Sequence, residues 1–404
     1  MDSLNIRHHF PIFKEHSDMI YFDNAATTQK PKYVIDAISN FYTHHNFNVH
    51  RSVYTDAGET TEMFEQSRQN IASFINASSA KEIVFSAGTT DSINLIANGY
   101  YAKHIQEGDE IVVSIAEHHS NLLPWQKIAK NNGATLKFIP LNEDANLDLN
   151  AAKQIISDKT KLVAVTAVSN VLGNINPIDQ LTTLAHEHGA DILVDGAQAA
   201  PELPIDVQET PIDWLAFSGH KMMAPTGIGV LYGKQYLLEN MDSPRVGGEM
   251  IESVSTTDYK VKDIPYRLEA GTPNIEGVIG LDAAISYLKE LKMTNVQEQC
   301  EKLGQYLYDQ LNALDGVSVY GPTKRQTGIV SFNVDNIHPH DAATFLDSKN
   351  IDVRAGQHCA EPLTHKLGVN ATLRASLYIY NTIEECNRLV DCINEMKEFF
   401  NGSK

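Results

Sequence analysis

Short apolar runs alternate along most of the chain with longer stretches in which apolar positions recur at helical spacing. The short runs are apolar throughout, which is typical of strands buried on both faces of a parallel sheet. Strands interleaved with amphipathic helices indicate an α/β fold. The predicted strands are 82–86, 110–114, 136–140, 162–166, 191–195, 214–218 and 229–232, and the helices between them include 92–101, 123–131, 150–157 and 180–188.

The pattern changes after about residue 285, where a second kind of organisation begins. One long helix is expected from Glu276 to Leu314, and then a strand at 328–334, a strand-like stretch at 373–380 and a terminal helix from Thr382. This is typical of a smaller α+β unit. No internal repeat or low-complexity linker separates the two parts, so we expect them to pack closely.

We therefore predict two domains. Residues 18–287 are expected to form a large α/β domain around a mostly parallel seven-stranded sheet. Residues 288–404 are expected to form a small α+β domain, which the N-terminal segment 1–17 joins.

The charge of the chain limits its partners. Its 404 residues carry 51 acidic and 32 basic side chains, for a net charge of −19. This excess argues against binding to nucleic acids or anionic membranes, which attract clustered Lys and Arg. No apolar run approaches the ~20 residues needed to span a bilayer, and the N-terminus lacks a signal-peptide pattern. We therefore expect a cytoplasmic protein.

Four cysteines occur without a Cys-x-x-Cys pair, which favours free thiols over a disulfide framework. Cys300, Cys386 and Cys392 lie in helical-looking stretches, where a cysteine usually serves as a small apolar core residue. Cys359 differs, because its neighbours are polar and Gly356 and Pro362 mark a loop. It is therefore a candidate nucleophile.

Several polar residues lie just past predicted strands, at the edge where open parallel sheets bind ligands. Asp195 ends one strand, and such a buried carboxylate needs a cation, for instance a protonated pyridinium, unless it caps a helix. Gln198 follows it. Lys221 follows the strand 214–218, where an apolar setting would lower its pKa and favour a Schiff base, although a surface lysine is the alternative.

Further candidates have similar alternatives. The segment Ser86-Ala-Gly-Thr89-Thr90 suits a phosphate but also an ordinary helix N-terminus. His118 would stack on a planar cofactor or be structural. Arg374, in a strand-like apolar stretch, needs a bidentate carboxylate from the protein or from a substrate. The joint occurrence of these residues favours a cofactor site.

At this point the sequence resembles the pyridoxal-phosphate cysteine desulfurases of the class V aminotransferase group, specifically the SUF-type (group II) branch, over essentially its whole length. The fold implied is fold type I of the pyridoxal-phosphate-dependent transferases. Ser218-Gly-His220-Lys221 with Asp195-Gly-Ala-Gln198 is specific for the superfamily, and the motif Arg-x-Gly-x-His-Cys, here residues 354–359, is specific for the branch. The other matching stretches are 21–31, 88–90, 117–121, 169–173, 269–274, 374–376 and 380–382.

The resemblance implies a role for each matching residue. Lys221 would hold the cofactor and later move protons, and Cys359 would attack the sulfur of bound cysteine, leaving a persulfide and releasing alanine. Arg374 and Asn170 would grip the substrate carboxylate, and Arg354 would order the cysteine loop. The remaining cofactor contacts would be Asp195 to the pyridine nitrogen, Gln198 to the phenolic oxygen, His118 stacked on the ring, and Thr89, Thr90, Ser218 and His220 to the phosphate, with Thr272 supplied by the partner subunit.

The same resemblance implies a homodimer and a small SufE- or SufU-like acceptor protein, because a short loop cannot carry sulfur far. It implies iron–sulfur cluster assembly as the destination of the sulfur, and no metal site. Two segments depart from close relatives: Gln357 replaces a histidine, and residues 52–58 differ from the usual pattern after His50-Arg51.

Three alternatives stay open. One is a selenocysteine lyase or cysteine sulfinate desulfinase, whose chemistry leans less on the thiol. Another is a transaminase or kynureninase-like enzyme, which has no evident use for the cysteine loop. The third is a scaffold subunit without activity.

Overall fold

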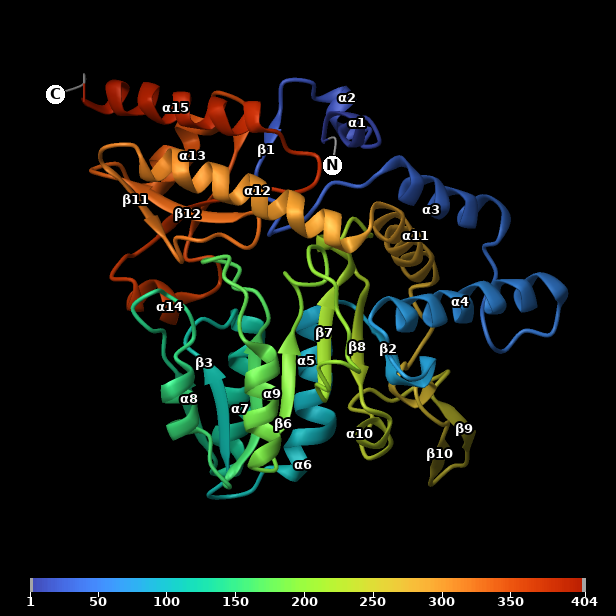
Figure 1. Ribbon diagram of the computed structural model, residues 1–404. Helices are drawn as coiled ribbons and strands as arrows, with labels where there is room; N and C mark the ends of the chain where they lie inside the picture. Colours follow the sequence, from blue (N-terminus) through green and yellow to red (C-terminus); the bar gives the residue numbers. More distant parts are fainter. Residues whose placement is uncertain (1–2, 402–404) are drawn as a thin grey trace.

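The computed structural model describes residues 3–401 and has the predicted seven-stranded α/β sheet at its centre (Figure 1). The strand order is β2-β8-β7-β6-β5-β3-β4. All neighbours are parallel except β8, which runs antiparallel to both β2 and β7. The strands are β2 (Ile83–Ser86), β3 (Glu110–Ser114), β4 (Thr135–Ile139), β5 (Thr160–Thr166), β6 (Asp191–Asp195), β7 (Trp214–Ser218) and β8 (Gly229–Gly233).

Helices cover both faces of this sheet, which is why its strands are apolar at nearly every position. Adjacent residues of β3 show the division: Val112 packs with one core cluster, whereas Ile111 and Val113 pack with another on the opposite face. The first face is covered by α3 (Lys32–His44), α4 (Thr55–Phe74), α8 (Leu149–Ile155), α9 (Ile178–Glu187) and α11 (Ile275–Leu291), and the second by α5 (Thr89–Ile96), α7 (Leu123–Asn132) and α10 (Gln235–Glu239).

A second, four-stranded antiparallel sheet has the order β11-β12-β15-β14. Helices α12, α13 and α15 supply apolar residues to its own core cluster. Its elements are β11 (Val317–Tyr320), β12 (Ile329–Val334), β14 (Arg354–Gly356), β15 (Thr372–Ser376), α12 (Met293–Asn312), α13 (Pro339–Asp347), α14 (Glu361–Lys366) and α15 (Ile383–Asn401).

The N-terminal segment lies between the two units and contacts both, since Phe10 and Phe13 belong to the core cluster of the large unit (Figure 1). Strand β1 (Ile20–Tyr21) pairs with β13 (Ile351–Asp352), and Arg7 forms an ion pair of 2.8 Å with Glu385 of α15. The remaining elements are α1 (Ser3–Arg7), α2 (Ile12–Glu15), α6 (Ala102–His104) and the hairpin β9 (Ile251–Val254) and β10 (Tyr259–Val261). Residues 20–21 thus pair with the small unit, although they fall within the predicted large domain. The domains 18–287 and 288–404 remain a proposal, and residues 1–2 and 402–404 lie outside the described part.

Two predictions about the C-terminal part are wrong. The long helix expected from Glu276 to Leu314 is two helices, because Lys292 adopts a left-handed conformation with φ 66° and ends α11. The first helix is buried on most sides in the large core, whereas the second packs on the small sheet, so the chain has to change direction between them. The stretch 373–380 is a strand only as far as Ser376.

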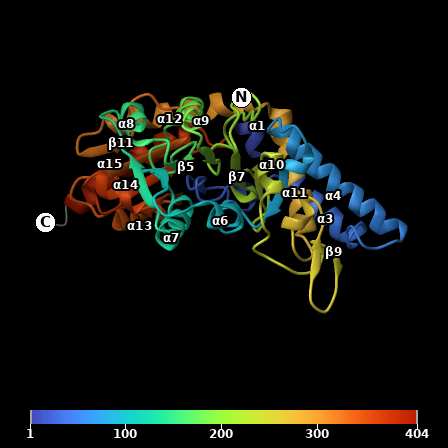
Figure 2. The same cartoon turned by 90° about the horizontal axis from the view of Figure 1, so that it is seen from below.

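The two units define the place of the candidate site. In Figure 1 the small sheet and its helices lie beyond the ends of β6 and β7, and Figure 2 shows α3, α4 and the β9 hairpin at the far end of the molecule from α13 and α15. No helix within residues 3–401 combines the length and hydrophobicity needed to cross a bilayer.

Candidate active site

A cavity of about 230 Å³ opens at the carboxyl ends of the central strands, between the large sheet and the cysteine loop. This is the position where open parallel sheets bind ligands. Every candidate site residue from the sequence except Thr272 lines it, namely Thr89, Thr90, His118, Asn170, Asp195, Gln198, Ser218, His220, Lys221, Arg354, Cys359 and Arg374. The chain thus brings together residues more than 250 positions apart, from Thr89 to Arg374.

Lys221 and Asp195 form the charged centre of the cavity. Asp195 ends β6 and is 3% exposed, and its Oδ1 accepts a hydrogen bond of 2.9 Å from the Ala197 N–H. Burial raises the pKa of Asp195, while that N–H and the charge of Lys221 oppose the rise. Asp195 makes no ion pair with any described residue, so its carboxylate is available to a cationic group of a ligand.

The amine of Lys221 is reactive for a physical reason. The residue ends the turn Gly219–Lys221 that follows β7, and its Nζ makes no hydrogen bond within residues 3–401. Burial lowers the pKa of Lys221 to about 8, against the opposing charge of Asp195. About a tenth of this amine is therefore neutral at pH 7, far more than for an ordinary lysine, and the neutral form is the one that a nucleophile requires.

One end of the cavity is rich in N–H and hydroxyl groups. Thr89 begins α5, and both its N–H and its Oγ1 lie within 2.8 Å of Ser218 Oγ, at 2.8 and 2.7 Å. Thr90 Oγ1 lies 2.6 Å from Ser120 Oγ. Gly229 lies so close behind this turn that a Cβ there would be 2.4 Å from Gly88 Cα. This end suits a phosphate, since the N–H groups at a helix start attract anions.

His118 and His220 are neutral at this site. Burial, followed by the positive charge of Lys221, lowers the pKa of His118 to about 3 and that of His220 to about 4. The Nδ1 of His118 accepts a hydrogen bond of 3.1 Å from the Ser120 N–H, which orients the ring. A neutral, oriented imidazole beside the Lys221 amine suits stacking on a flat ligand.

Arg374 lies at the other end and has an internal carboxylate partner. It is 2% exposed in β15, and its two Nη groups donate to Asn170 O and to Asp23 Oδ1, each at 2.9 Å. Its Nε is buried without a hydrogen-bond partner among the described residues. The Asn170 amide donates to His358 O at 2.8 Å. Of the two partners considered for Arg374, the protein carboxylate is therefore present, and a basic group remains available to a second anion.

The loop that carries Cys359 is held in an uncommon conformation. His358 and Cys359 both have left-handed backbones, with φ 54° and 56°, and each such non-glycine residue costs about 1–3 kcal/mol. Cys359 O accepts a hydrogen bond of 2.7 Å from the His119 N–H, and the His358 ring lies 2.9 Å from Thr372 Oγ1. The loop is thus fixed, and the Cys359 thiol is exposed at the cavity.

Some lining residues were not identified from the sequence. Ser120 and His358 line the cavity beside predicted residues, and Asp23 binds Arg374. Asp23 lies in the matching stretch 21–31, which was the available signal, but its partner is 351 residues away. Only the folded chain shows this pairing.

Thr272 and the two departures lie elsewhere. Thr272 is exposed and lines a separate hollow beside Ala87 and Gly227. Gln357 Nε2 lies 3.5 Å from Glu361 Oε1, and neither Gln357 nor residues 52–58 line the cavity.

Comparisons with known proteins agree with this geometry. The sequence matches the family Aminotransferase class-V over residues 20–389. A probable cysteine desulfurase of Halalkalibacterium halodurans is 48% identical over 403 residues, which cover 99% of both chains. The crystal structure of the cysteine desulfurase CsdA from Escherichia coli superposes with a TM-score of 0.93 at 38% identity, covering 99% of each chain. An apo cysteine desulfurase from Thermococcus onnurineus NA1 has the same TM-score at 42% identity and 97% coverage of each chain. The chain therefore belongs to the class-V aminotransferase family.

Proposed function

We propose that the protein is a pyridoxal-phosphate-dependent cysteine desulfurase, which converts L-cysteine to L-alanine and holds the sulfur as a persulfide on Cys359. One observation carries the proposal: a single cavity is lined by the reactive amine of Lys221, the buried carboxylate of Asp195 and the exposed thiol of Cys359. The relatives named above carry the same activity in their names.

The residues present fit pyridoxal phosphate. Asp195 is a buried anion without an ion-pair partner among the described residues, as a pyridinium nitrogen requires. Lys221 would hold the aldehyde, Gln198 the phenolic oxygen and His118 the ring face. The phosphate would be held by Thr89, Thr90, Ser218 and His220. When bound, this cofactor supplies an electron sink next to the substrate α-carbon.

The chain's own groups would then act in order. Arg374 and Asn170 bind the substrate carboxylate, with Arg354 beside them, and so place the substrate sulfur toward the loop. The Cys359 thiolate forms an S–S bond with that sulfur as the substrate C–S bond breaks, because the thiolate is the attacking form of cysteine. The electron pair of the broken bond stays with the organic fragment, and Lys221 Nζ delivers the proton that completes alanine.

The lowered pKa of Lys221 predicts a pH dependence. An ordinary lysine amine is neutral only above about 10.5, but this one is neutral above about 8. The rate at which cofactor-free protein attaches pyridoxal phosphate covalently should therefore rise through about pH 8 and then level off. The measurement is the initial rate of attachment, trapped by borohydride, across this range.

The comparison variant is Asp195→Asn. It removes the negative charge that raises the pKa of Lys221 against the effect of burial, so the midpoint of the attachment rate should move to lower pH. A lysine peptide measured in parallel should keep rising beyond pH 10. A protein profile that follows the peptide would contradict the prediction.

The finer assignments are part of the proposal. We place the protein in the SUF-type branch, in the cytoplasm, as a homodimer in which Thr272 of each chain completes the phosphate site of the other. Its exposure and its separation from the chain's own cavity support this placement. The four cysteines are free thiols, as expected in a reducing compartment.

A mobile partner is also part of the proposal. The loop of Cys359 is tied to His119 and Asn170, so the persulfide stays at the cavity, and a small SufE- or SufU-like protein has to come to it. The sulfur would then serve iron–sulfur cluster assembly.

The test is a single turnover without reductant. Protein loaded with cofactor and mixed with L-cysteine should form about one alanine per chain and then stop, and the peptide that contains Cys359 should gain the mass of one sulfur atom. Formation of a keto acid without alanine would instead support a transaminase. Rapid turnover of selenocysteine or cysteine sulfinate, with unmodified Cys359, would support a lyase of that kind.

A further inference from the structure

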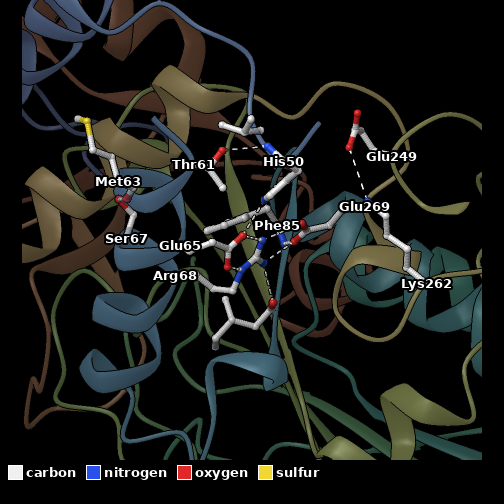
Figure 3. A network of polar contacts seen from close by, with 12 residues as sticks. His50, Thr61, Met63, Glu65, Ser67, Arg68, Phe85, Glu249, Lys262 and Glu269 are labelled. Atoms are coloured by element: carbon white, nitrogen blue, oxygen red, sulfur yellow. Dashed lines mark hydrogen bonds and ion pairs between the residues drawn. The ribbon is translucent and has the colours of Figure 1, made fainter. Parts of the chain in front are cut away.

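A buried ion pair lies outside the cavity, at the opposite edge of the large sheet from β4. Figure 3 shows the pair, which joins Arg68 of α4 to Glu269 in the segment after Leu268, together with Phe85 of β2 beside it. Arg68 of α4 is 1% exposed, and its Nη1 and Nη2 donate to the two carboxylate oxygens of Glu269 at 2.6 and 2.9 Å. Such a bidentate pair fixes direction as well as distance.

All five N–H groups of Arg68 have acceptors. Besides the two bonds to Glu269, its Nε and Nη2 donate to Glu65 at 3.0 and 3.4 Å, and its Nη1 donates to Ile83 O at 2.9 Å. The guanidinium also lies 4.4 Å from the centroid of the Phe85 ring. A fully satisfied, buried guanidinium has one orientation, so it is a rigid anchor.

The Glu65 carboxylate stays ionised within this network. Burial works against its charge, but the hydrogen bond from His50 and the charge of Arg68 together lower the pKa of Glu65 to about 2. His50 Nε2 lies 2.9 Å from Glu65 Oε1 (Figure 3). Arg68 is therefore paired with the Glu65 carboxylate of its own helix through one edge of the guanidinium, and the other edge binds Glu269.

The pair makes hydrogen bonds to the open edge of β2, where a further strand of the sheet would otherwise pair. Strand β2 is at the edge of the sheet and pairs only with β8, so no strand bonds the main-chain groups on its outer side. Glu269 Oε1 accepts the Phe85 N–H at 2.7 Å, and Arg68 donates to the carbonyl of Ile83. Residues two apart in a strand present their main-chain groups to the same edge. The ion pair therefore satisfies these two outward main-chain groups of β2, whose residues are all buried.

Glu269 is also the first residue of the segment that presents Thr272. The segment has few other ties: the Gly271 N–H donates to Gly248 O, and Asn274 donates to Gly227 O. Between these ties Thr272 is exposed, beside Ala87 in the hollow next to the phosphate-facing turn. The orientation of the segment that carries Thr272 thus depends on where Glu269 is held.

We infer that Glu269 and Arg68 are a positioning pair, which sets the Thr272 segment against the rigid edge of β2 so that Thr272 reaches the cofactor phosphate of the partner subunit. The inference rests on the proposed function in one respect, namely that the active form is a homodimer with a shared phosphate site. The effect of the pair is exerted on the partner's site and not on the chain's own cavity.

Glu269→Gln tests the pair. The substitution keeps the size of the side chain but turns one carboxylate oxygen into an NH₂ group, which faces a donor of Arg68 and breaks the bidentate contact. The dissociation constant of pyridoxal phosphate should rise about tenfold or more, the size typical of groups that orient a binding residue. Saturating cofactor should restore kcat, because no group that touches the substrate is changed.

Glu385→Gln is the matched control, since Glu385 forms a comparable part-buried pair with Arg7 in the small unit. It should lower the thermal stability but leave the cofactor affinity unchanged. Equal cofactor affinity in Glu269→Gln and the wild type would overturn the inference while leaving the single-turnover test of the proposed function intact.

Mixed dimers decide which site the pair serves. In a dimer of one Glu269→Gln chain and one Lys221→Ala chain, only the first chain can attach cofactor covalently, and it receives Thr272 from an intact segment. Its affinity, read from borohydride-trapped cofactor, should be that of the wild type. When both substitutions are in one chain and its partner is unchanged, the wild-type chain's site should be weakened.

The reverse pattern would place the effect of Glu269 in its own cavity and overturn the inference. The oligomeric state of the wild type is measured first, by sedimentation. A monomer that is active would overturn the shared site, and the inference with it, without affecting the chemistry proposed for Cys359.

Discussion

Replacement of Cys359 by alanine should abolish multiple turnover of L-cysteine while the cofactor stays bound. Cys359 is the exposed thiol at the cavity, and no other described cysteine is exposed. Loss of a covalent nucleophile lowers kcat on the order of a thousandfold or more. The measurement is alanine and sulfide release in the presence of a reductant, together with the visible absorbance of the bound cofactor.

Cys392→Ala is the control for this change. Cys392 is fully buried in the core of the small unit, so its replacement should affect stability and not turnover. Equal rates of alanine formation in Cys359→Ala and the wild type would remove the thiol from the mechanism. The selenocysteine or sulfinate lyase would then be the better account of the protein.

Replacement of Lys221 by alanine should have the second large effect, on both attachment of the cofactor and proton transfer. Lys221 lines the cavity, and its amine has no hydrogen-bond partner among residues 3–401. A positioned proton-transfer group contributes about 10²–10⁴-fold, so we expect kcat to fall by about 10⁴-fold with the covalent attachment lost as well. Alanine formation and borohydride-trapped cofactor measure the two effects separately.

Added small amines test the proton-transfer role directly. Methylamine should restore part of the activity of Lys221→Ala, because it enters the space of the missing side chain and can carry the proton. Lys30→Ala serves as the control: Lys30 is also largely buried and its pKa is lowered to about 8 by burial, but it does not line the cavity. A Lys221→Ala variant with activity within about tenfold of the wild type would contradict the assignment.

Most of the correct predictions came from patterns among residues that are close together in the sequence. Apolar runs bounded by turns predicted all seven strands of the large sheet to within a residue or two, since burial on both faces makes most positions of the inner strands apolar. The edge strand β4 is partly exposed and includes Lys137. The carboxyl ends of these strands then indicated Asp195 and Lys221, because the sheet brings such ends to one edge. The loop of Cys359 was evident from its polar neighbours and from Gly356.

Predictions failed, or were never made, where distant residues decide the outcome. Nothing in the sequence around Lys292 marks a break, since lysine is a good helix former. The left-handed turn there redirects the chain, so that α11 packs in the large core while Leu303 and later residues of α12 reach the core of the small unit. The pairing of Arg374 with Asp23 and that of Arg68 with Glu269 join residues 351 and 201 positions apart.

The sequence by itself therefore determined the class of fold, the order of its strands along the chain and the residue types at the cavity, because these follow from local burial and from motifs a few residues long. Only the tertiary structure decided which charges meet, which edge of the sheet is covered and where Thr272 is presented. The physical reason is that an ion pair or a satisfied strand edge depends on the approach of two segments, and that approach is set by the packing of the whole core and not by either segment alone.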